Sequence, residues 1–315
     1  MPSSWVQGFL DPDDYAAAIP AQVEITVTER GRFSAEFVNV HLHHLAVRRY
    51  SDSLSRVMHV GLGSRSVSLQ FSPGGLLANG LEYQSTNIVR HPPGADLHQY
   101  SSGSTKFAGL LLKTEDLAAF GDDAAHVLAP PREMVVSTPD PAAMARLQRL
   151  HSASVHLAKT APEIIANPNA ATGLEQALID AMVNCLSERK AHASSRLRQQ
   201  HAIVMRRFRG VLEENPEKSL YIPEICKAIG VSDRTLLICC HQYLGMGPRR
   251  YLTLRRMHLV RRALRAATLG TTTVTAVATQ YGFWHLSRFA REYQSLFGES
   301  PSITLGRPAQ ESLLL

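Results

Sequence analysis

Residues 219–248 read SLYIPEICKAIGVSDRTLLICCHQYLGMGP, and residues 273–305 read TVTAVATQYGFWHLSRFAREYQSLFGESPSITL. In each stretch, apolar residues at helical spacing precede a lone glycine, Gly230 or Gly282, and a second helical run follows. This layout is typical of two helices that cross steeply through a short glycine-containing turn. We therefore predict two helix-turn-helix units, each presenting a reading helix to a DNA major groove.

The second helix of each unit is expected to keep polar positions on its outward face. The first reading helix is predicted at residues 232–243, with Ser232 as its N-cap. The second is predicted at residues 284–297, where Trp284 is interpreted as a packing residue against the scaffold helix in preference to a wedge between bases. The outward positions of the two helices are Arg234, Leu237, Ile238, His241, His285, Ser287, Arg288 and Arg291.

A basic helix is predicted between the two units. It starts at Pro248, runs to about Ala267 and contains the segment RRYLTLRRMHLVRRALR, which has seven arginines and no acidic residue. Its length is ~28 Å at 1.5 Å per residue. A solvated charged face normally mixes both signs, so this composition favours a polyanion-facing role for at least some of these arginines.

Length and charge indicate two unequal domains. The chain has 315 residues, enough for two cores, and a net charge of +6. Residues 1–195 carry 15 Lys/Arg against 19 Asp/Glu, whereas residues 196–315 carry 18 against 8. A basic half next to a mildly acidic half indicates that one domain binds a polyanion. We found neither a signal peptide nor a membrane-spanning run, so a cytoplasmic protein without membrane contact is expected.

Short apolar runs from Val23 to Leu112, separated by Gly, Pro, Asn and Ser, predict an antiparallel sandwich or small barrel. The turn at residues 91–94 is expected to close one hairpin at the rim. Barrels of this kind often hold a small ligand in the mouth, although the fold alone does not establish one. The four cysteines are expected to be reduced and partly buried.

The periodicity changes to helical after a proline-rich joint. Helices are predicted at residues 143–157 and 172–189, and the second has a narrow stripe of Leu174, Leu178, Met182, Cys185 and Leu186. Two interpretations of this stripe stay open: packing against the barrel, or a helix-to-helix homodimer seam.

In its C-terminal part, the chain resembles the AraC family of bacterial transcription regulators. The matching elements are GVSDRTL, GMGPRRYL with the following LRRM, and VTAVATQYGFWHLSRFAREYQSLFGESPS. The resemblance implies an α+β chain: an N-terminal antiparallel β-barrel (cupin-like) with a helical hairpin, and an all-α C-terminal domain of two helix-turn-helix units joined by a long helix. The implied domains are effector binding and dimerisation at 1–190 (barrel to about 135, helices at about 140–189), a linker at 191–200, DNA binding at 201–307 and a tail at 308–315.

The resemblance also implies functional residues and partners. The base-reading positions are Arg234, Leu237, Ile238, Leu286, Ser287, Arg288 and Arg291. The phosphate-contacting positions are Ser232, His241, Arg249, Arg250 and His285. The implied partners are double-stranded DNA, an unknown small-molecule effector in the N-terminal barrel and a second copy in a homodimer, and RNA polymerase is compatible with an activator role. Leu237 and Ile238 stand where polar residues are usual, so the first unit should discriminate less by hydrogen bonding.

Histidines in the N-terminal half raise an alternative function. His41 and His43 are spaced for one face of a strand, as in metal-binding cupins, and His59, His91 and His98 would complete a set. The sequence after His44, LAVRRYSD, lacks the nearby acidic residue of that motif, so no metal, cofactor or catalytic residue is predicted and the chain is interpreted as a non-enzyme. The alternatives are a cupin-type metalloenzyme fused to a DNA-binding module and a constitutive regulator without a ligand.

Overall fold

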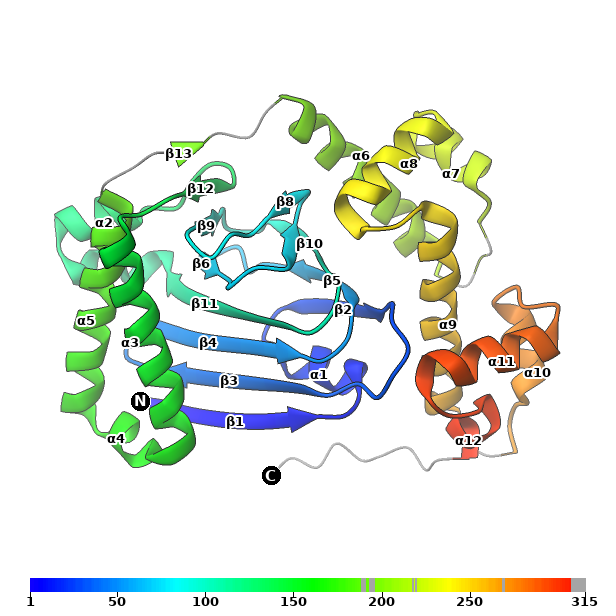
Figure 1. The fold of residues 1–315 in the computed structure, drawn as a ribbon, viewed down its shortest axis with the longest axis horizontal. Coiled ribbons are helices and arrows are strands. Elements are labelled where there is room, and N and C mark those ends of the chain that lie inside the picture. Colours follow the sequence, from blue (N-terminus) through cyan, green and yellow to red (C-terminus); the bar gives the residue numbers. More distant parts are fainter. Residues whose placement is uncertain (188–190, 193–195, 217, 219, 268–269, 307–315) are drawn as a thin grey trace.

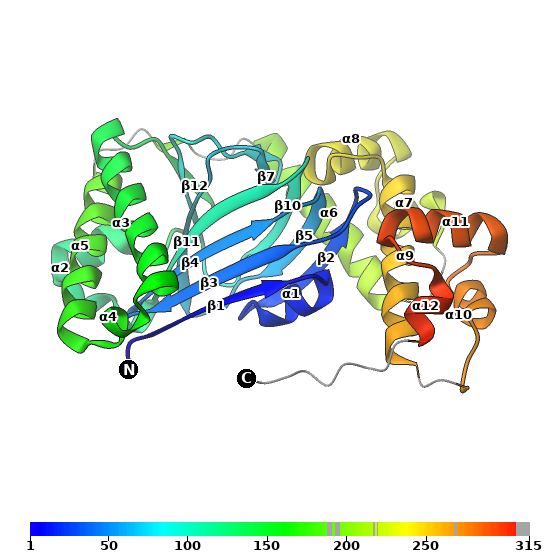
Figure 2. The same ribbon diagram turned by 60° about the horizontal axis from the view of Figure 1, so that its bottom comes forward.

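The computed structural model describes residues 1–187, 191–192, 196–216, 218, 220–267 and 270–306. Two antiparallel sheets form its centre (Figure 1). Helices α2 to α5 gather at one side of the sheets, and the C-terminal helices lie at the opposite side (Figures 1 and 2). The predicted opening of the first unit at Ser219 and the predicted tail at 308–315 lie outside the described residues.

The larger sheet contains eight strands, and the smaller sheet contains five. In spatial order, the larger sheet is β1 (Ser3–Phe9), β3 (Ala35–His41), β4 (Leu45–Asp52), β11 (Thr105–Lys113), β6 (Ser66–Phe71), β9 (Ile88–His91), β12 (Val135–Ser137) and β13 (Ala191–His192). The smaller sheet is β2 (Gln22–Val27), β5 (Arg56–Gly61), β10 (Asp96–Ser101), β7 (Leu76–Ala78) and β8 (Leu81–Glu82).

Alternation along the strands divides the larger sheet between two cores. On β3, Val38 and Val40 face a core shared with the flanking helices, whereas Phe37 faces a core between the two sheets. Successive side chains of a strand point to opposite faces, so both faces of this sheet are covered. Phe37, Tyr50 and Phe107 stack across three neighbouring strands, with ring centroids 4.8 and 4.5 Å apart.

The N-terminal half also contains helices that flank the sheets. They are α1 (Pro12–Ala18), the 3-10 helix η1 (Thr114–Phe120), α2 (Asp122–Leu128), α3 (Pro141–Thr160), α4 (Pro162–Ala166) and α5 (Pro168–Ser187). The apolar stripe on α5 packs within this half: Leu178, Met182, Cys185 and Leu186 are buried with strand residues and α3 in one core. Because these side chains are already covered, barrel packing accounts for the stripe, and these residues do not supply a homodimer seam.

The C-terminal half is entirely helical among its described residues. Its elements are α6 (Arg196–Glu214), α7 (Ile222–Ile229), α8 (Asp233–Leu244), α9 (Pro248–Ala266), α10 (Val274–Gln280), α11 (Leu286–Phe297) and α12 (Pro301–Gly306). Helix α6 begins within the predicted linker at 191–200, so residues 196–200 are helical. No helix in the described part of the chain is long and apolar enough to cross a membrane.

The predicted fold class is confirmed, with corrections in detail. The barrel consists of two separate antiparallel sheets rather than one closed ring. The turn at residues 91–94 does not close a hairpin: β9 belongs to the larger sheet and β10 to the smaller one, so the turn carries the chain between sheets. Strand β1 and helix α1 precede the region predicted as strands, because their short segments offer too few residues for a clear periodicity.

A buried ion pair lies where β4 passes into β5. The Arg56 Nε donates to Asp52 Oδ2 over 2.8 Å, and both side chains are inaccessible to solvent. Burial raises the pKa of Asp52 above its usual value, although the Arg56 charge opposes that rise. Removing one member alone therefore leaves an uncompensated buried charge.

We expect Asp52→Ala to lower the free energy of unfolding by about 3–5 kcal/mol, because it strands the Arg56 guanidinium in the core. The double variant Asp52→Leu, Arg56→Met buries no charge. Its free energy of unfolding should therefore fall less than that of the single variant. Urea denaturation of the three proteins measures both effects. Equal losses in the single and double variants would show that the ion pair has no such role.

Candidate nucleic-acid interface

The first unit is built by α7 and α8 with their caps. Gly230 ends α7 in the left-handed region at φ 73°, where glycine is free of steric cost. The Ser232 hydroxyl accepts a hydrogen bond from the Thr235 backbone N–H over 3.2 Å and caps α8. Leu236, Cys239 and Cys240 are fully buried beneath α8. Ser232 is thus the N-cap, as predicted, and the reading helix runs from Asp233 to Leu244.

The predicted outward residues of α8 are confirmed as exposed. Arg234, Leu237, Ile238 and His241 form one stripe opposite the buried face. Two of them are apolar: Leu237 is 44% exposed and Ile238 is 47% exposed. The stripe thus presents large apolar side chains between a guanidinium and an imidazole.

The second unit differs from the prediction at its turn. Thr273 caps α10 by accepting from the Ala276 backbone N–H over 3.1 Å, and α11 begins at Leu286 rather than at residue 284. His285 is the N-cap residue and lies outside the helix. Trp284 is 75% exposed, so its interpretation as a packing residue is wrong. The turn places Phe283 over the core instead, 4.9 Å from the Phe289 ring, and leaves Trp284 in solvent.

The outward face of α11 is charged. Ser287, Arg288 and Arg291 are exposed as predicted, whereas Leu286 is only partly exposed and packs against the core of this unit. Leu286 is therefore less available for base contact than the other three predicted positions. Arg288 Nε donates to Glu292 Oε1 over 2.7 Å, one helical turn away, so Arg288 must share or leave this partner to read a base.

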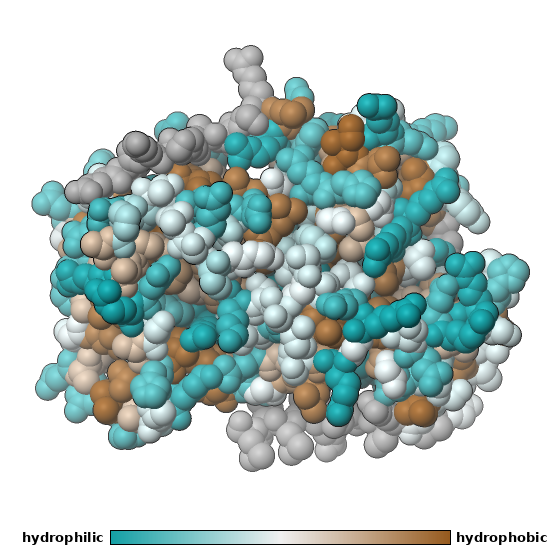
Figure 3. Space-filling view, in the orientation of Figure 1, coloured by the Kyte–Doolittle hydropathy of each residue, from teal (hydrophilic) through white to brown (hydrophobic). Residues whose placement is uncertain are grey.

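The predicted phosphate contacts are all at the surface. Ser232, His241, Arg249, Arg250 and His285 are exposed. Arg249 and Arg250 lie in the first turn of α9, directly after the first unit. Hydrophilic and hydrophobic side chains are mixed over the C-terminal helices (Figure 3).

The other arginines of α9 have different surroundings. Four of them form ion pairs with acidic residues of the N-terminal half, and we call this cluster the acid–arginine joint. Its basic members are Arg255, Arg261, Arg262 and Arg265, and its acidic members are Asp11, Asp13, Asp14 and Glu24. Arg256 lies over the Phe283 ring at 5.3 Å. The expectation that this helix faces a polyanion is therefore restricted to its start, because intramolecular carboxylates occupy most of the remaining arginines.

Short contacts hold the acid–arginine joint. Arg262 Nε lies 2.7 Å from Asp13 Oδ1, Arg265 Nη1 lies 2.6 Å from Asp11 Oδ1, and Arg261 donates to Asp11. Burial of Asp11 favours its neutral form, but the hydrogen bond and charge of Arg261 outweigh this and lower the pKa of Asp11 below its usual value. Asp11 is also the N-cap residue of α1, and its side chain accepts a hydrogen bond from the Asp13 backbone N–H. The residue that caps α1 is therefore also a member of the joint.

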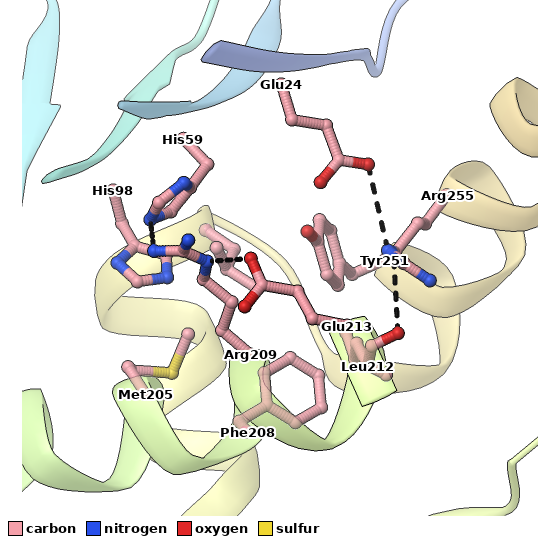
Figure 4. Close-up of a pocket in the computed structure, with 11 residues that line it drawn as sticks. Glu24, His59, His98, Met205, Phe208, Arg209, Leu212, Glu213, Tyr251 and Arg255 are labelled. Carbon is pink, nitrogen blue, oxygen red and sulfur yellow. Dashed lines mark hydrogen bonds and ion pairs between the residues drawn. The ribbon is translucent and has the colours of Figure 1, made fainter. Parts of the chain in front are cut away.

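A second polar contact lies where α6 and α9 meet the smaller sheet (Figure 4). Arg209 of α6 points toward His59 and donates to its Nε2 and to Asp96 Oδ1. Arg255 donates to the Leu212 carbonyl over 3.3 Å. These side chains surround a small cavity of about 20 Å³, so the two halves of the chain fit closely here.

The histidines at this contact are held neutral. Burial, then the neighbouring His98 ring and the charge of Arg209, lower the pKa of His59 to about 2. Burial and Arg209 also lower the pKa of His98 to about 4, with Asp96 opposing. An arginine can only donate, so His59 Nε2 acts as an acceptor and its ring is neutral. The His59 and His98 ring centroids lie 4.8 Å apart.

A larger cavity of about 120 Å³ lies between the two sheets. Its lining includes the aromatic rings of Tyr50 and Phe107 and the amide side chains of Gln70 and Gln99. Gln99 Nε2 donates to Gln70 Oε1 over 3.3 Å, but the buried Gln99 Oε1 has no hydrogen-bond partner in the described part of the chain. A buried acceptor of this kind is suited to a donor from a ligand. For comparison, an engineered apolar cavity of about 150 Å³ binds benzene.

In the described part of the chain, the histidines behind the metal alternative do not form one cluster, although His59 and His98 are neighbours. His41 ends β3 and is exposed, and His43 lies next to Pro168 O at 3.2 Å. His91 contacts the Tyr83 hydroxyl over 2.8 Å inside the core. Within the residues that the structure describes, no three His, Cys, Asp or Glu side chains gather as a metal site.

A helix-turn-helix family model and known transcription regulators match part of the chain. Residues 225–307 match the family model of a helix-turn-helix domain. The XylDLEGF operon transcriptional activator 2 of Pseudomonas putida is 37% identical over 94 residues, which are 30% of this chain and 60% of that protein. The probable thc operon regulatory protein of Rhodococcus erythropolis is 37% identical over 91 residues, 29% of this chain and 27% of that protein. The match thus spans less than two thirds of either relative.

Two solved structures resemble a larger part of the chain. The AraC-like transcriptional activator CuxR is 15% identical, with a TM-score of 0.45 over 87% of this chain and 99% of that chain. ToxT from Vibrio cholerae O395 is 12% identical, with a TM-score of 0.29 over 83% of this chain and 97% of that chain.

The neutral histidines predict a pH dependence of stability. The pKa of His98 is about 4 in the folded protein against 6.5 ordinarily, so the unfolded chain binds more protons between these values. Stability is therefore full above pH 6.5 and falls as the pH drops through this window, by about 1.4 kcal/mol per pH unit for one group. Urea denaturation between pH 7 and pH 5 measures the free energy of unfolding, which should decline less steeply for His98→Gln than for the parent. Identical slopes would contradict the assignment of this pH dependence to His98.

Proposed function

We propose that this chain, whose residues 225–307 match the family model of a helix-turn-helix domain, is a ligand-responsive transcription regulator of the AraC type that reads two adjacent major-groove segments. Activation is the favoured outcome, because the named relatives include operon activators. The proposal implies a cytoplasmic, non-enzymatic protein, since its target is DNA. It also includes assembly as a homodimer and, for an activator, contact with RNA polymerase.

The single observation that carries the DNA-binding proposal is the exposed face of each reading helix. On α11, Ser287, Arg288 and Arg291 are exposed opposite the buried Phe289 and Tyr293. Arginine can form a bidentate pair with guanine, which is the commonest specific contact in the major groove. Arg249 and Arg250 add exposed positive charge between the two units, where it would neutralise phosphates.

The cavity between the sheets supports the effector part of the proposal. The segment Ile19–Ala21, which directly follows α1, lines this cavity. The opposite end of α1 holds Asp11, Asp13 and Asp14, which belong to the acid–arginine joint. Helix α1 spans only seven residues, about 10 Å at 1.5 Å per residue. One short, rigid element therefore connects the cavity to the helix that joins the reading units.

This connection gives a physical route for regulation. A ligand changes DNA binding only if it binds one domain arrangement better than another. An occupant that displaces the Ile19–Ala21 segment would move the acidic end of α1 relative to α9. In the present arrangement Arg288 lines an open cleft together with Glu29 and Arg30 of the N-terminal half. Loosening the joint would let that half withdraw from the second reading helix.

The reading positions predict distinct effects on DNA. Arg288→Ala or Arg291→Ala should relax base preference at one or two positions, at a cost of about 1–3 kcal/mol of discrimination. Arg249→Ala should weaken binding to all sequences alike. It should also reduce the slope of log K against log salt concentration by about 1. Selection from a random DNA pool at a stated salt concentration measures the first effect, and titrations at several salt concentrations measure the second.

Arg146→Ala provides a matched control, because Arg146 is exposed on α3, away from the DNA-binding domain. Unchanged selection profiles for Arg288→Ala and Arg291→Ala would refute the role given to α11. Absence of DNA binding by the parent chain would refute the proposed function as a whole.

The acid–arginine joint predicts a gain of DNA affinity. The double variant Asp13→Asn, Asp14→Asn removes partners of Arg261, Arg262 and Arg265 without changing side-chain size. We expect tighter effector-free DNA binding, because the domains part more readily and arginines are released. Asp123→Asn on α2, an exposed residue outside the joint, is the matched control. Affinity equal to that of the control at low salt would argue against coupling through this joint.

A further inference from the structure

Three large apolar side chains are exposed at the reading surfaces of the DNA-binding domain. Leu237 and Ile238 on α8 are 44% and 47% exposed, and Trp284 at the start of the second unit is 75% exposed. None of them belongs to the buried core of either unit. Exposed apolar area of this size favours contact with an apolar surface of a partner, because burial removes it from water.

The surroundings of these side chains indicate the partner. Leu237 and Ile238 lie between Arg234 and His241 on α8, and Arg249 follows at the start of α9. A basic rim around an apolar centre is complementary to a polyanion that also offers apolar groups. DNA has such groups in its major groove, where the 5-methyl group of thymine is displayed beside the base edges.

The chemistry of the side chains narrows the readout. Leucine and isoleucine have neither donor nor acceptor, so they form no hydrogen bond with a base edge. Cytosine lacks the 5-methyl group, and guanine and adenine present no methyl group in the major groove. An apolar side chain in contact with a base therefore distinguishes thymine from the other three by methyl contact.

We propose that the first unit selects thymine-bearing base pairs through apolar contact of Leu237 and Ile238 with thymine 5-methyl groups, and that Trp284 makes a further apolar contact at the second unit. This inference rests on the proposed function and identifies the DNA chemistry that it reads. The N-terminal part of a reading helix is the part that contacts base edges. Trp284 directly precedes the N-cap of α11, so its indole is close to that position.

Methyl deletion in the DNA tests the inference. A site selected from a random pool by the parent protein is resynthesised with each thymine replaced in turn by deoxyuridine, which removes only the methyl group. We expect a loss of about fourfold in affinity for each methyl group contacted, at a few positions, at constant salt. Loss at none of the thymines, with binding to the selected site intact, would overturn the inference and leave the proposed function standing.

Variants assign the effect to residues. In Leu237→Ala or Ile238→Ala, the thymine and deoxyuridine forms of the matching position should bind equally, because the methyl group has lost its contact. Lys227→Ala, at an exposed position of α7, is the control that should keep the full methyl effect. A methyl effect that persists unchanged in both α8 variants would overturn the assignment. Both substituted residues are exposed, and unchanged thermal unfolding verifies that the variants fold.

Fluorescence reports on the second unit. The chain has two tryptophans, so Trp5→Phe leaves Trp284 as the only indole. Its emission should shift to the blue when the selected DNA is added, because the exposed ring leaves water. Unchanged emission at saturating DNA would overturn the role of Trp284, and a shift caused by purified RNA polymerase without DNA would assign this side chain to a protein partner instead. If the parent chain binds no DNA in the pool, the proposed function fails before the methyl test begins.

Discussion

The pairing of α9 arginines with carboxylates of the N-terminal half determines how the two halves of the chain fit together. A helix with seven arginines and no acid would be strained by its own repulsion in a compact protein. Asp11, Asp13 and Glu24 neutralise the part of α9 that faces the sheets. Arg249 and Arg250, at the beginning of the helix, are exposed. The same helix therefore supplies a domain contact along most of its length and a basic surface at its start.

This pairing changes the meaning of the charge asymmetry. The acidic N-terminal half and the basic C-terminal half are partly complementary to each other, so only part of the positive charge is available to nucleic acid. Salt screens both the ion pairs of arginine with carboxylates and those of arginine with phosphates. The arginines of the joint and the exposed Arg249 and Arg250 occupy different parts of the same helix, so the domain contact and the basic surface are both carried by α9.

The two helix-turn-helix units are held differently. The core of the first unit includes Val57 of β5, and Tyr100 of β10 packs against it. A side chain at Gly245, which ends α8, would collide with the Tyr100 ring. Among the described residues, the core of the second unit draws on α9 to α12 and the turns between them and on no strand. The first unit is therefore anchored to the sheets, whereas the second depends on α9 for its position.

The sequence alone was sufficient for the features that depend on local periodicity and capping. Both reading helices, their glycine turns and the exposed faces with Arg234, Ser287 and Arg288 follow from spacing along one segment. Tertiary structure decided what long-range contacts control. The sequence pattern of an arginine-rich helix is the same whether its side chains contact water, phosphate or the carboxylate of residue 13. The acid–arginine joint could therefore not be predicted from the sequence of α9. The crossing between sheets at residues 91–94 and the exposure of Trp284 also depend on which surfaces the folded chain brings together.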